Sequence, residues 1–146
     1  SNVDELAIGY FRPFLEDNRL KDPLSVERMV ICSGKVYYDL LQKAEELSLY
    51  NVALVRVEQL YPFPDHDIQQ YLRSFKSAKD IVWCQEEPKN MGAWFFVSDR
   101  IQQILAKGQK LRYAGRQASA SPAAGQKKIH DAEQLQLVMQ ALESIE

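Results

Sequence analysis

Glu86 and Glu87 stand at the predicted junction of a strand and a helix, followed closely by Lys89. The apolar run at residues 81–84 precedes them, and Pro88 interrupts the group. Because proline cannot donate a ladder hydrogen bond, we expect the strand to stop at about Glu86. Functional groups gather at this edge of open α/β sheets. Carboxylates alone more often pair with arginines than catalyse, since ion-pair networks are common at positions without catalytic roles.

The predicted partner of these glutamates is Arg116, which follows a short strand expected at residues 111–114. If that strand neighbours the strand at residues 81–85, Arg116 lies at the same edge as Glu86 and Glu87. A planar guanidinium can bind a carboxylate through two hydrogen bonds. We therefore expect Glu86, Glu87 and Arg116 to form a structural clamp between two loops, with catalysis as the alternative interpretation.

A second set of residues has the chemistry of an anion site. Ser33 and Lys35 lie at a predicted strand-to-helix turn, and Arg56 lies near the end of the next strand. Backbone N–H groups at a helix start, with a hydroxyl and an ammonium beside them, suit a phosphate or a carboxylate. The sequence lacks the glycine spacing of nucleotide phosphate loops. The alternative is an ordinary capped helix start with surface charges.

Composition and charge argue against several classes of function. The 18 basic and 20 acidic residues are scattered along the 146-residue chain, so nucleic acid is not an expected partner. No apolar run approaches the ~20 residues that span a bilayer, and no membrane partner is expected. Cys32 and Cys84 each close an apolar run and are expected to be reduced and buried, side by side if their strands are neighbours, as in a cytoplasmic protein.

No metal site and no catalytic residue are predicted. The cysteines and histidines have no close ligand spacing. The histidines, His66 and His130, lie near predicted helix starts, and no spacing joins either of them to a nucleophile.

These residues are positioned by a regular alternation of strands and helices. Short apolar runs at residues 29–32, 52–57, 81–85 and 111–114 have the length and type of buried strands. Apolar residues at helical spacing follow each run, in the sets Val36, Leu40, Ala44, Leu47; Ile68, Tyr71, Leu72, Phe75; Trp94, Val97, Ile101, Leu105; and Leu135, Val138, Leu142, Ile145. Such alternation predicts a three-layer α/β/α fold with a mostly parallel sheet.

Local signals set the expected boundaries. Asp65 follows a proline-rich linker and is expected to cap the second helix, and the last helix is expected to begin near Asp131 in a capping box. Residues 1–27 lack periodicity and are expected to form an irregular N-terminal arm, with an edge strand between Tyr10 and Leu15. Residues 28–146 are expected to form a single α/β/α domain.

Several stretches together resemble the C-terminal region of the thiamine diphosphate-dependent decarboxylating component of 2-oxoglutarate dehydrogenase. They are residues 32–40, 55–64, 83–94, 113–116 and 119–123. They occur in the order and spacing of that family, from about Val3 to the end of the chain. The first and last stretches are similar to the bacterial branch of the family.

The resemblance implies a fold similar to the C-terminal domain of transketolases. That fold has a five-stranded mixed sheet whose first strand runs against the others, which suits the Phe11–Leu15 segment. The full family enzyme uses thiamine diphosphate and magnesium to decarboxylate 2-oxoglutarate, and it succinylates the lipoyl group of a partner acyltransferase. The cofactor motif and catalytic histidines of the family lie in upstream domains, so we expect this chain to bind no cofactor and to be inactive alone.

For this chain the resemblance therefore implies one domain of a longer polypeptide, and the irregular N-terminal arm agrees with that expectation. Its implied role is structural, in contact with the upstream domains and within a homodimer. Some family members bind a nucleotide or acyl-coenzyme A effector in this domain, and we expect such a site at Ser33, Lys35 and Arg56. The alternative is a free-standing α/β module that binds a nucleotide or acyl-coenzyme A.

Overall fold

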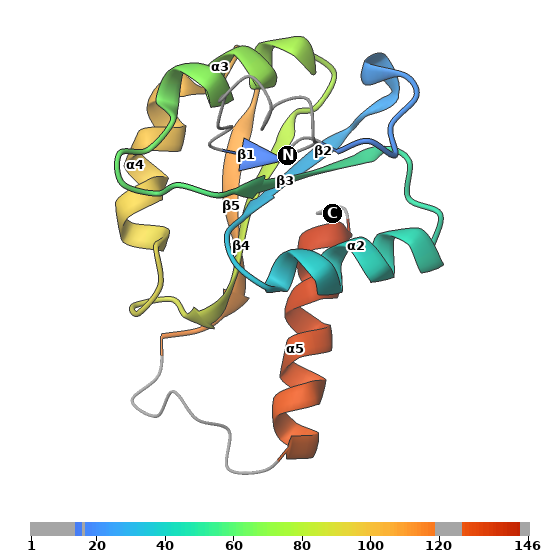
Figure 1. The fold of residues 1–146 in the computed structure, drawn as a ribbon, viewed down its shortest axis with the longest axis vertical. Helices are drawn as coiled ribbons and strands as arrows, with labels where there is room; N and C mark the ends of the chain where they lie inside the picture. Colours follow the sequence, from blue (N-terminus) through green and yellow to red (C-terminus); the bar gives the residue numbers. More distant parts are fainter. Residues whose placement is uncertain (1–13, 16, 119–126, 144–146) are drawn as a thin grey trace, which may run out of the picture.

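Strands and helices alternate along the chain and build one mixed sheet with helices on both faces (Figure 1). The computed structural model describes residues 14–15, 17–118 and 127–143. The strand order is β1-β3-β2-β4-β5, with β1 (Phe14–Leu15), β2 (Arg28–Cys32), β3 (Val52–Val57), β4 (Asp80–Pro88) and β5 (Lys110–Arg116). β2 to β5 are parallel, and β1 runs antiparallel to β3. The predicted mixed sheet with an odd first strand is confirmed, and residues 10–13 of the predicted first strand lie outside the described residues.

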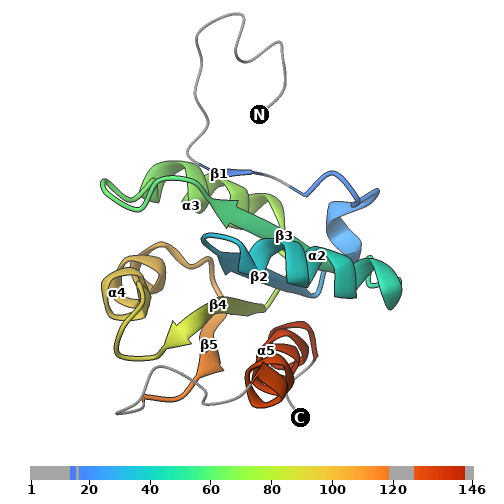
Figure 2. The ribbon, with the colours of Figure 1, turned by 60° about the horizontal axis from the view of Figure 1, so that its bottom comes forward.

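The helices form the two outer layers. They are α2 (Val36–Glu46), α3 (Asp65–Ser74), α4 (Trp94–Ile104) and α5 (Lys127–Leu142), with a short 3-10 helix η1 (Pro23–Ser25) before β2. α3 and α4 cover one face of the sheet, and α2 and α5 cover the other (Figure 2). This is the predicted α/β/α arrangement. No helix within the described ranges is long and apolar enough to cross a membrane.

Successive residues of the central strand β2 point to opposite faces of the sheet. Met29 and Ile31 belong to the core under α3 and α4, whereas Val30 and Cys32 belong to the core under α2 and α5. All of them are fully buried, as expected for a strand with helices on both faces. Burial on both faces fixes the register of the parallel strands, because a slip would exchange the two cores.

Some of the predicted helix boundaries need correction. Asp65 is the first residue of α3 and not its cap, because Pro64 occupies the cap position and no side chain caps the helix. Leu47 lies beyond the last turn of α2 and is 47% exposed rather than buried. α5 begins at Lys127, before the predicted start near Asp131. The capping signals therefore located these helices but not their first residues.

The buried face of α5 also differs from the prediction. The buried residues of this helix are Leu137, Val138, Ala141 and Leu142. Leu135 is 50% exposed, and Ile145 lies outside the described residues. Gln134 precedes Val138 by one turn, so a hydrogen-bonded amide occupies the position where the apolar stripe would continue.

β4 continues past its predicted stop. The strand reaches Pro88, which is the register partner of Arg116 in β5. The pairing with β5 shifts between Gln85 and Pro88, as at a β-bulge. An irregular ladder at the end of a strand accommodates a proline, which has no N–H group to donate. The prediction that the strand stops at Glu86 was therefore wrong.

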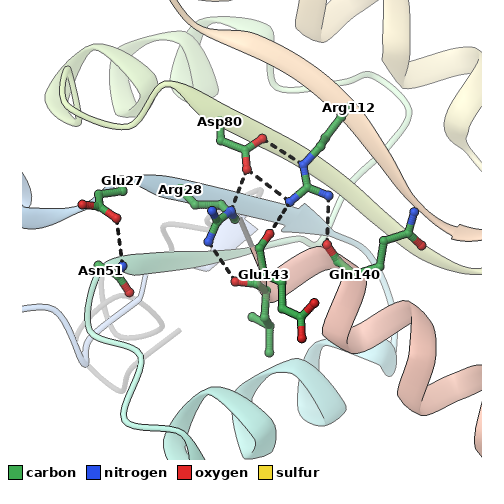
Figure 3. A network of polar contacts seen from close by, with 8 residues as sticks. Glu27, Arg28, Asn51, Asp80, Arg112, Gln140 and Glu143 are labelled. Atoms are coloured by element: carbon green, nitrogen blue, oxygen red, sulfur yellow. Dashed lines mark hydrogen bonds and ion pairs between the residues drawn. The ribbon is translucent and has the colours of Figure 1, made fainter. Parts of the chain in front are cut away.

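At the amino ends of the strands, a polar network fastens the last turn of α5 to the sheet (Figure 3). Asp80 accepts hydrogen bonds from the Nε atoms of Arg28, at 2.6 Å, and Arg112, at 2.9 Å. The same guanidiniums donate to the carbonyl oxygens of Gln140, Leu142 and Glu143. Carbonyls in the last turn of a helix lack intrahelical partners and attract cations. The network therefore fixes the position of α5, whose other end reaches the opposite edge of the sheet.

The described part of the N-terminal arm is bonded to β3 by side chains. Asp17 is buried, and its carboxylate accepts a hydrogen bond from the backbone N–H of Leu54 at 2.9 Å. Arg19 pairs with Asp17 at 2.8 Å and donates to the carbonyl oxygens of Leu49 and Val52. The contacts to Leu54 and Val52 satisfy backbone groups along the edge of β3 that the short strand β1 leaves uncovered.

Candidate functional site

A pocket of about 330 Å³ lies at the carboxyl edge of the parallel strands. Its walls come from the turn before α2, the ends of β4 and β5, the β4–α4 turn and the first turn of α5, through Lys35, Glu86, Glu87, Pro88, Met91, Arg116 and His130. The pocket brings Lys35 of the predicted anion site together with the three members of the predicted clamp. Ligands of open α/β sheets bind outside the carboxyl ends of the strands, which makes this pocket the candidate site.

Arg116 is the most heavily bonded side chain of the pocket. Its guanidinium donates to the backbone carbonyl of Glu86 at 2.7 Å and to the Oε1 atom of Gln134 at 3.3 Å. It pairs with Glu133 at 3.2 Å and lies 3.3 Å from the Nδ1 atom of His130. The Arg116 side chain is 12% exposed, against 44% for Glu133. Arg116 is therefore engaged by groups of the protein itself.

The predicted ion pair between Arg116 and Glu86 or Glu87 is wrong. Within the described part of the chain, the ion-pair partner of Arg116 is Glu133. The carboxylate of Glu86 instead accepts a hydrogen bond from the amide of Gln134 at 2.9 Å, and Gln134 in turn accepts one from Arg116. The cause is the position of α5, whose residues Glu133 and Gln134 lie against Arg116 at this edge. Arg116 does join the ends of β4 and β5, but through a backbone carbonyl.

Gln85 is the polar centre beneath the pocket, and it is 2% exposed. Its Oε1 atom accepts hydrogen bonds from the indole of Trp83 at 2.9 Å and from the backbone N–H of Trp94 at 3.1 Å. Its amide nitrogen donates to the carbonyls of Glu87 at 3.1 Å and Pro88 at 3.0 Å. The amide thus uses both of its donors and both lone pairs, and it fixes the β4–α4 turn on β4.

Two glycines leave the space that Gln85 occupies. A Cβ atom at Gly92 would lie 2.7 Å from the Gln85 side chain. A Cβ atom at Gly115 would lie 2.6 Å from the Gln85 carbonyl oxygen and from the Tyr113 hydroxyl. Only glycine permits such close approach. Sequence reasoning missed the role of Gln85, although a lone amide in a buried strand is a signal that hydrogen-bond partners must surround it.

Lys89 covers the aromatic side of the site. Its Nζ atom lies 5.2 Å from the ring centroid of Tyr113 and 6.0 Å from that of Trp94. The carbonyl of Arg116 accepts hydrogen bonds from the Lys89 backbone N–H at 3.1 Å and from the Tyr113 hydroxyl at 2.6 Å. Burial raises the pKa of Tyr113 to about 12, so this hydroxyl keeps its proton at neutral pH. Lys89 therefore packs on the rings of Tyr113 and Trp94 by cation–π attraction.

The predicted anion-site residues end or follow neighbouring strands. Cys32, the last residue of β2, is the register partner of Arg56 in β3. Ser33 and Lys35 follow Cys32, so they lie at the same edge as Arg56, as predicted. Lys35 lines the pocket, whereas Ser33 and Arg56 are not among its lining residues.

Arg56 is directed toward the first turn of α2. It donates to the Tyr38 hydroxyl at 3.0 Å, and its guanidinium lies 5.2 Å from the Tyr38 ring centroid and 5.9 Å from that of Tyr37. Its Nε atom is buried without a hydrogen-bond partner and lies 3.8 Å from the Glu58 carboxylate. Arg56 thus carries an unused buried donor beside two tyrosine rings.

Cys32 and Cys84 are register partners on β2 and β4, and both are buried free thiols, as predicted. Burial raises the pKa of Cys84 to about 12, and the Glu86 carboxylate acts in the same direction. Burial also raises the pKa of Cys32, with a further contribution from Cys84. The raised pKa values disfavour the thiolate form, which is the nucleophilic form of cysteine.

The arrangement is suited to the recognition of charged groups. Lys35 precedes α2, where the positive end of the helix dipole favours an anion. Glu86 and Glu87 supply carboxylates on another wall of the same pocket. In the ranges that the structure describes, no group of three or more histidines, cysteines, aspartates or glutamates is placed to hold a metal ion.

Sequence comparison relates the chain to a known family of enzymes. Residues 1–142 match the family described as 2-oxoglutarate dehydrogenase C-terminal. The chain is 46% identical over 142 residues to the 2-oxoglutarate dehydrogenase E1 component of Haemophilus influenzae, and 43% identical over 144 residues to that of Azotobacter vinelandii. Each alignment covers 97% of this chain but only 15% of the relative. The chain therefore spans a small part of the length of these relatives.

Structural comparison supports the fold alone. A solved structure described as a split gene transketolase, inactive beta4 tetramer, superposes with a TM-score of 0.60 at 14% sequence identity. The similarity covers 91% of this chain and 44% of that chain. The predicted likeness to a transketolase fold is confirmed.

Proposed function

The chain belongs to the 2-oxoglutarate dehydrogenase C-terminal family, and from this membership we propose that it is the C-terminal domain of a bacterial-type E1 component. One observation carries the proposal: the alignment to an E1 component covers 97% of this chain at 46% identity but only 15% of the relative. This coverage does not favour a free-standing module.

The complete polypeptide would decarboxylate 2-oxoglutarate and succinylate the lipoyl group of a partner acyltransferase in the bacterial cytoplasm. Thiamine diphosphate supplies the chemistry of decarboxylation when it is bound with magnesium, and other domains of the polypeptide would hold both. This domain would contribute structure and contacts within a homodimer. That role agrees with a site in which Arg116 and Gln85 are bonded to groups of the domain itself.

Isothermal calorimetry with thiamine diphosphate and magnesium tests whether other domains of the polypeptide bind the cofactor. The complete E1 polypeptide should bind the cofactor, whereas the 146-residue chain, with its fold checked by circular dichroism, should release no binding heat. A micromolar affinity of the 146-residue chain for the cofactor would overturn the domain assignment.

A regulatory role is the second part of the proposal. We infer that Ser33, Lys35 and Arg56 bind an anionic effector, either a nucleotide or acyl-coenzyme A. Support comes from Lys35 in the wall of the pocket and from the buried Nε atom of Arg56, which has no hydrogen-bond partner. A phosphate placed beside α2 would gain both a guanidinium and the helix dipole.

Titration of AMP and of acetyl-coenzyme A into the complete E1 polypeptide tests the effector site. Lys35→Ala and Arg56→Ala should each weaken binding by about tenfold or more, since each removes a charge-assisted contact. Lys43→Ala is the matched control, because Lys43 pairs with Glu46 further along α2. Absence of binding heat for both ligands, or equal affinity of all variants, would refute the effector site.

A further inference from the structure

Aromatic side chains from the β3–α3 loop and from α4 form an apolar face on the domain. Tyr61 is 67% exposed and Phe95 is 62% exposed. The ring of Phe96 lies 4.4 Å from the ring of Tyr61 and 6.5 Å from that of Phe63, which is buried. The core therefore supports the Tyr61–Phe96 pair from below. Tyr61, Phe95 and Phe96 are called the aromatic face.

Helix geometry explains why Phe95 points outward. Consecutive helical residues are separated by about 100°, so Phe95 stands almost opposite Val97, which is fully buried. Trp94 packs against Tyr113, with ring centroids 5.2 Å apart, and Phe96 packs against the β3–α3 loop. Phe95, between these two rings, faces away from the core of the domain.

The rim of the aromatic face is polar. The Arg100 guanidinium lies 4.5 Å from the Phe96 ring centroid and 3.7 Å from the carboxylate of Asp65. An aromatic centre with an arginine at its border has the composition of a protein–protein interface, in which aromatic residues, methionine and arginine are enriched. Met91, in the β4–α4 turn, is a further exposed apolar side chain at this edge and is 57% exposed.

The path of the chain indicates what covers this face. Phe14 is the register partner of Val57, the last residue of β3, so the first described strand begins at the carboxyl edge. Tyr61 lies in the loop that leaves β3 at this same edge. The E1 relatives extend far beyond the 15% of their length that this chain matches. A large amount of polypeptide would therefore be tethered close to the aromatic face.

We propose that the remainder of the E1 polypeptide packs on Tyr61, Phe95 and Phe96. This inference rests on the proposed function, because it requires a longer E1 chain. Apolar contact area would hold the domains together, and the tether would raise the effective concentration of the two surfaces.

Hydroxyl-radical footprinting of the complete E1 polypeptide tests the docking surface. Tyr50 is the matched control, because it is a tyrosine of similar exposure, 55%, in the loop between α2 and β3. Tyr61 and Phe95 should oxidise more than about fivefold more slowly in the native polypeptide than in urea, as expected for buried interface aromatics. Tyr61 should also be better protected than Tyr50.

Two footprinting results would overturn the inference. A native oxidation rate of Tyr61 within about twofold of the rate in urea would leave the face uncovered and would overturn the inference. Protection that is lost on dilution would assign the face to contacts between separate chains, which also overturns it. Release of CO₂ from 2-oxoglutarate is measured on the same sample. If the polypeptide is active and Tyr61 is exposed, only the docking surface fails, whereas an inactive polypeptide counts against the proposed function.

Discussion

Arg116 forms its ion pair with Glu133, at 3.2 Å, and meets Glu86 through the backbone carbonyl of that residue, at 2.7 Å. The first relationship joins β5 to α5, and the second joins β5 to the end of β4. One guanidinium therefore holds three elements at the carboxyl edge. Because the Arg116 side chain is 12% exposed, these bonds are largely shielded from solvent.

Arg116→Ala should lower the free energy of unfolding by about 2–3 kcal/mol, because the Glu86 carbonyl and the Gln134 amide lose a donor in a part-buried setting. Glu133→Ala should cost no more than about 1 kcal/mol, since Glu133 is 44% exposed. Urea denaturation measures both values. An equally large loss for Glu87→Ala would show that Arg116 depends on Glu87 rather than on its partners in α5.

Gln85→Leu should be among the most destabilising substitutions at this edge. It removes the acceptor of Trp83 and Trp94 and the donor to two carbonyls, and it should cost about 2–4 kcal/mol. Gln103→Leu is the matched control, because Gln103 is exposed on α4, and it should change stability by less than about 0.5 kcal/mol. Comparable midpoints of the two variants in urea would contradict the role assigned to Gln85.

Asp80→Ala should loosen the end of α5. Two guanidiniums would lose their shared carboxylate, and the expected cost is about 2–4 kcal/mol, below the cost for a fully buried pair because Asp80 is 21% exposed. Hydrogen exchange should accelerate in the last turn of α5. Glu27→Ala removes an exposed hydrogen bond to Asn51 near the same edge, and it should leave that exchange unchanged. The network would be refuted if both variants exchanged alike.

The free energy of unfolding should decrease at alkaline pH, partly because the Cys84 thiol ionises more readily in the unfolded state. Burial raises the pKa of Cys84 to about 12, whereas an unfolded cysteine titrates near 8.5. The folded state therefore holds the Cys84 proton more tightly than the unfolded state. The stability that this proton contributes is fully present below about pH 8.5 and is lost as the pH rises toward 12. Cys84→Ala should therefore show a shallower decline of unfolding free energy in that range. Parallel pH profiles for wild type and variant would exclude the effect.

The layers and strands could be predicted because each depends on a local apolar pattern. Cys32 and Cys84 end apolar runs, and the parallel register places them side by side. The structure of the carboxyl edge of the sheet could not be predicted in the same way. The bulge between Gln85 and Pro88 depends on how the ladder accommodates a residue without an N–H group, and no local pattern encodes it.

The partners of Arg116 were missed for a different reason. Glu133 and Gln134 reach it because α5 packs across the carboxyl edge of the sheet, and the helical pattern did not show where the helix would pack. Charge complementarity in the sequence favoured Glu86 and Glu87, which are nearer to the ends of neighbouring strands. Three-dimensional placement of one helix thus decided which carboxylate the arginine binds.

The central claim is that this chain is one domain of a larger enzyme that decarboxylates 2-oxoglutarate. The most direct test measures CO₂ release from 2-oxoglutarate, with thiamine diphosphate and magnesium, by the natural polypeptide that contains these residues and by the 146-residue chain. The account predicts turnover by the natural polypeptide and none by the 146-residue chain. A natural polypeptide that purifies intact, binds the cofactor and leaves 2-oxoglutarate unchanged would contradict it.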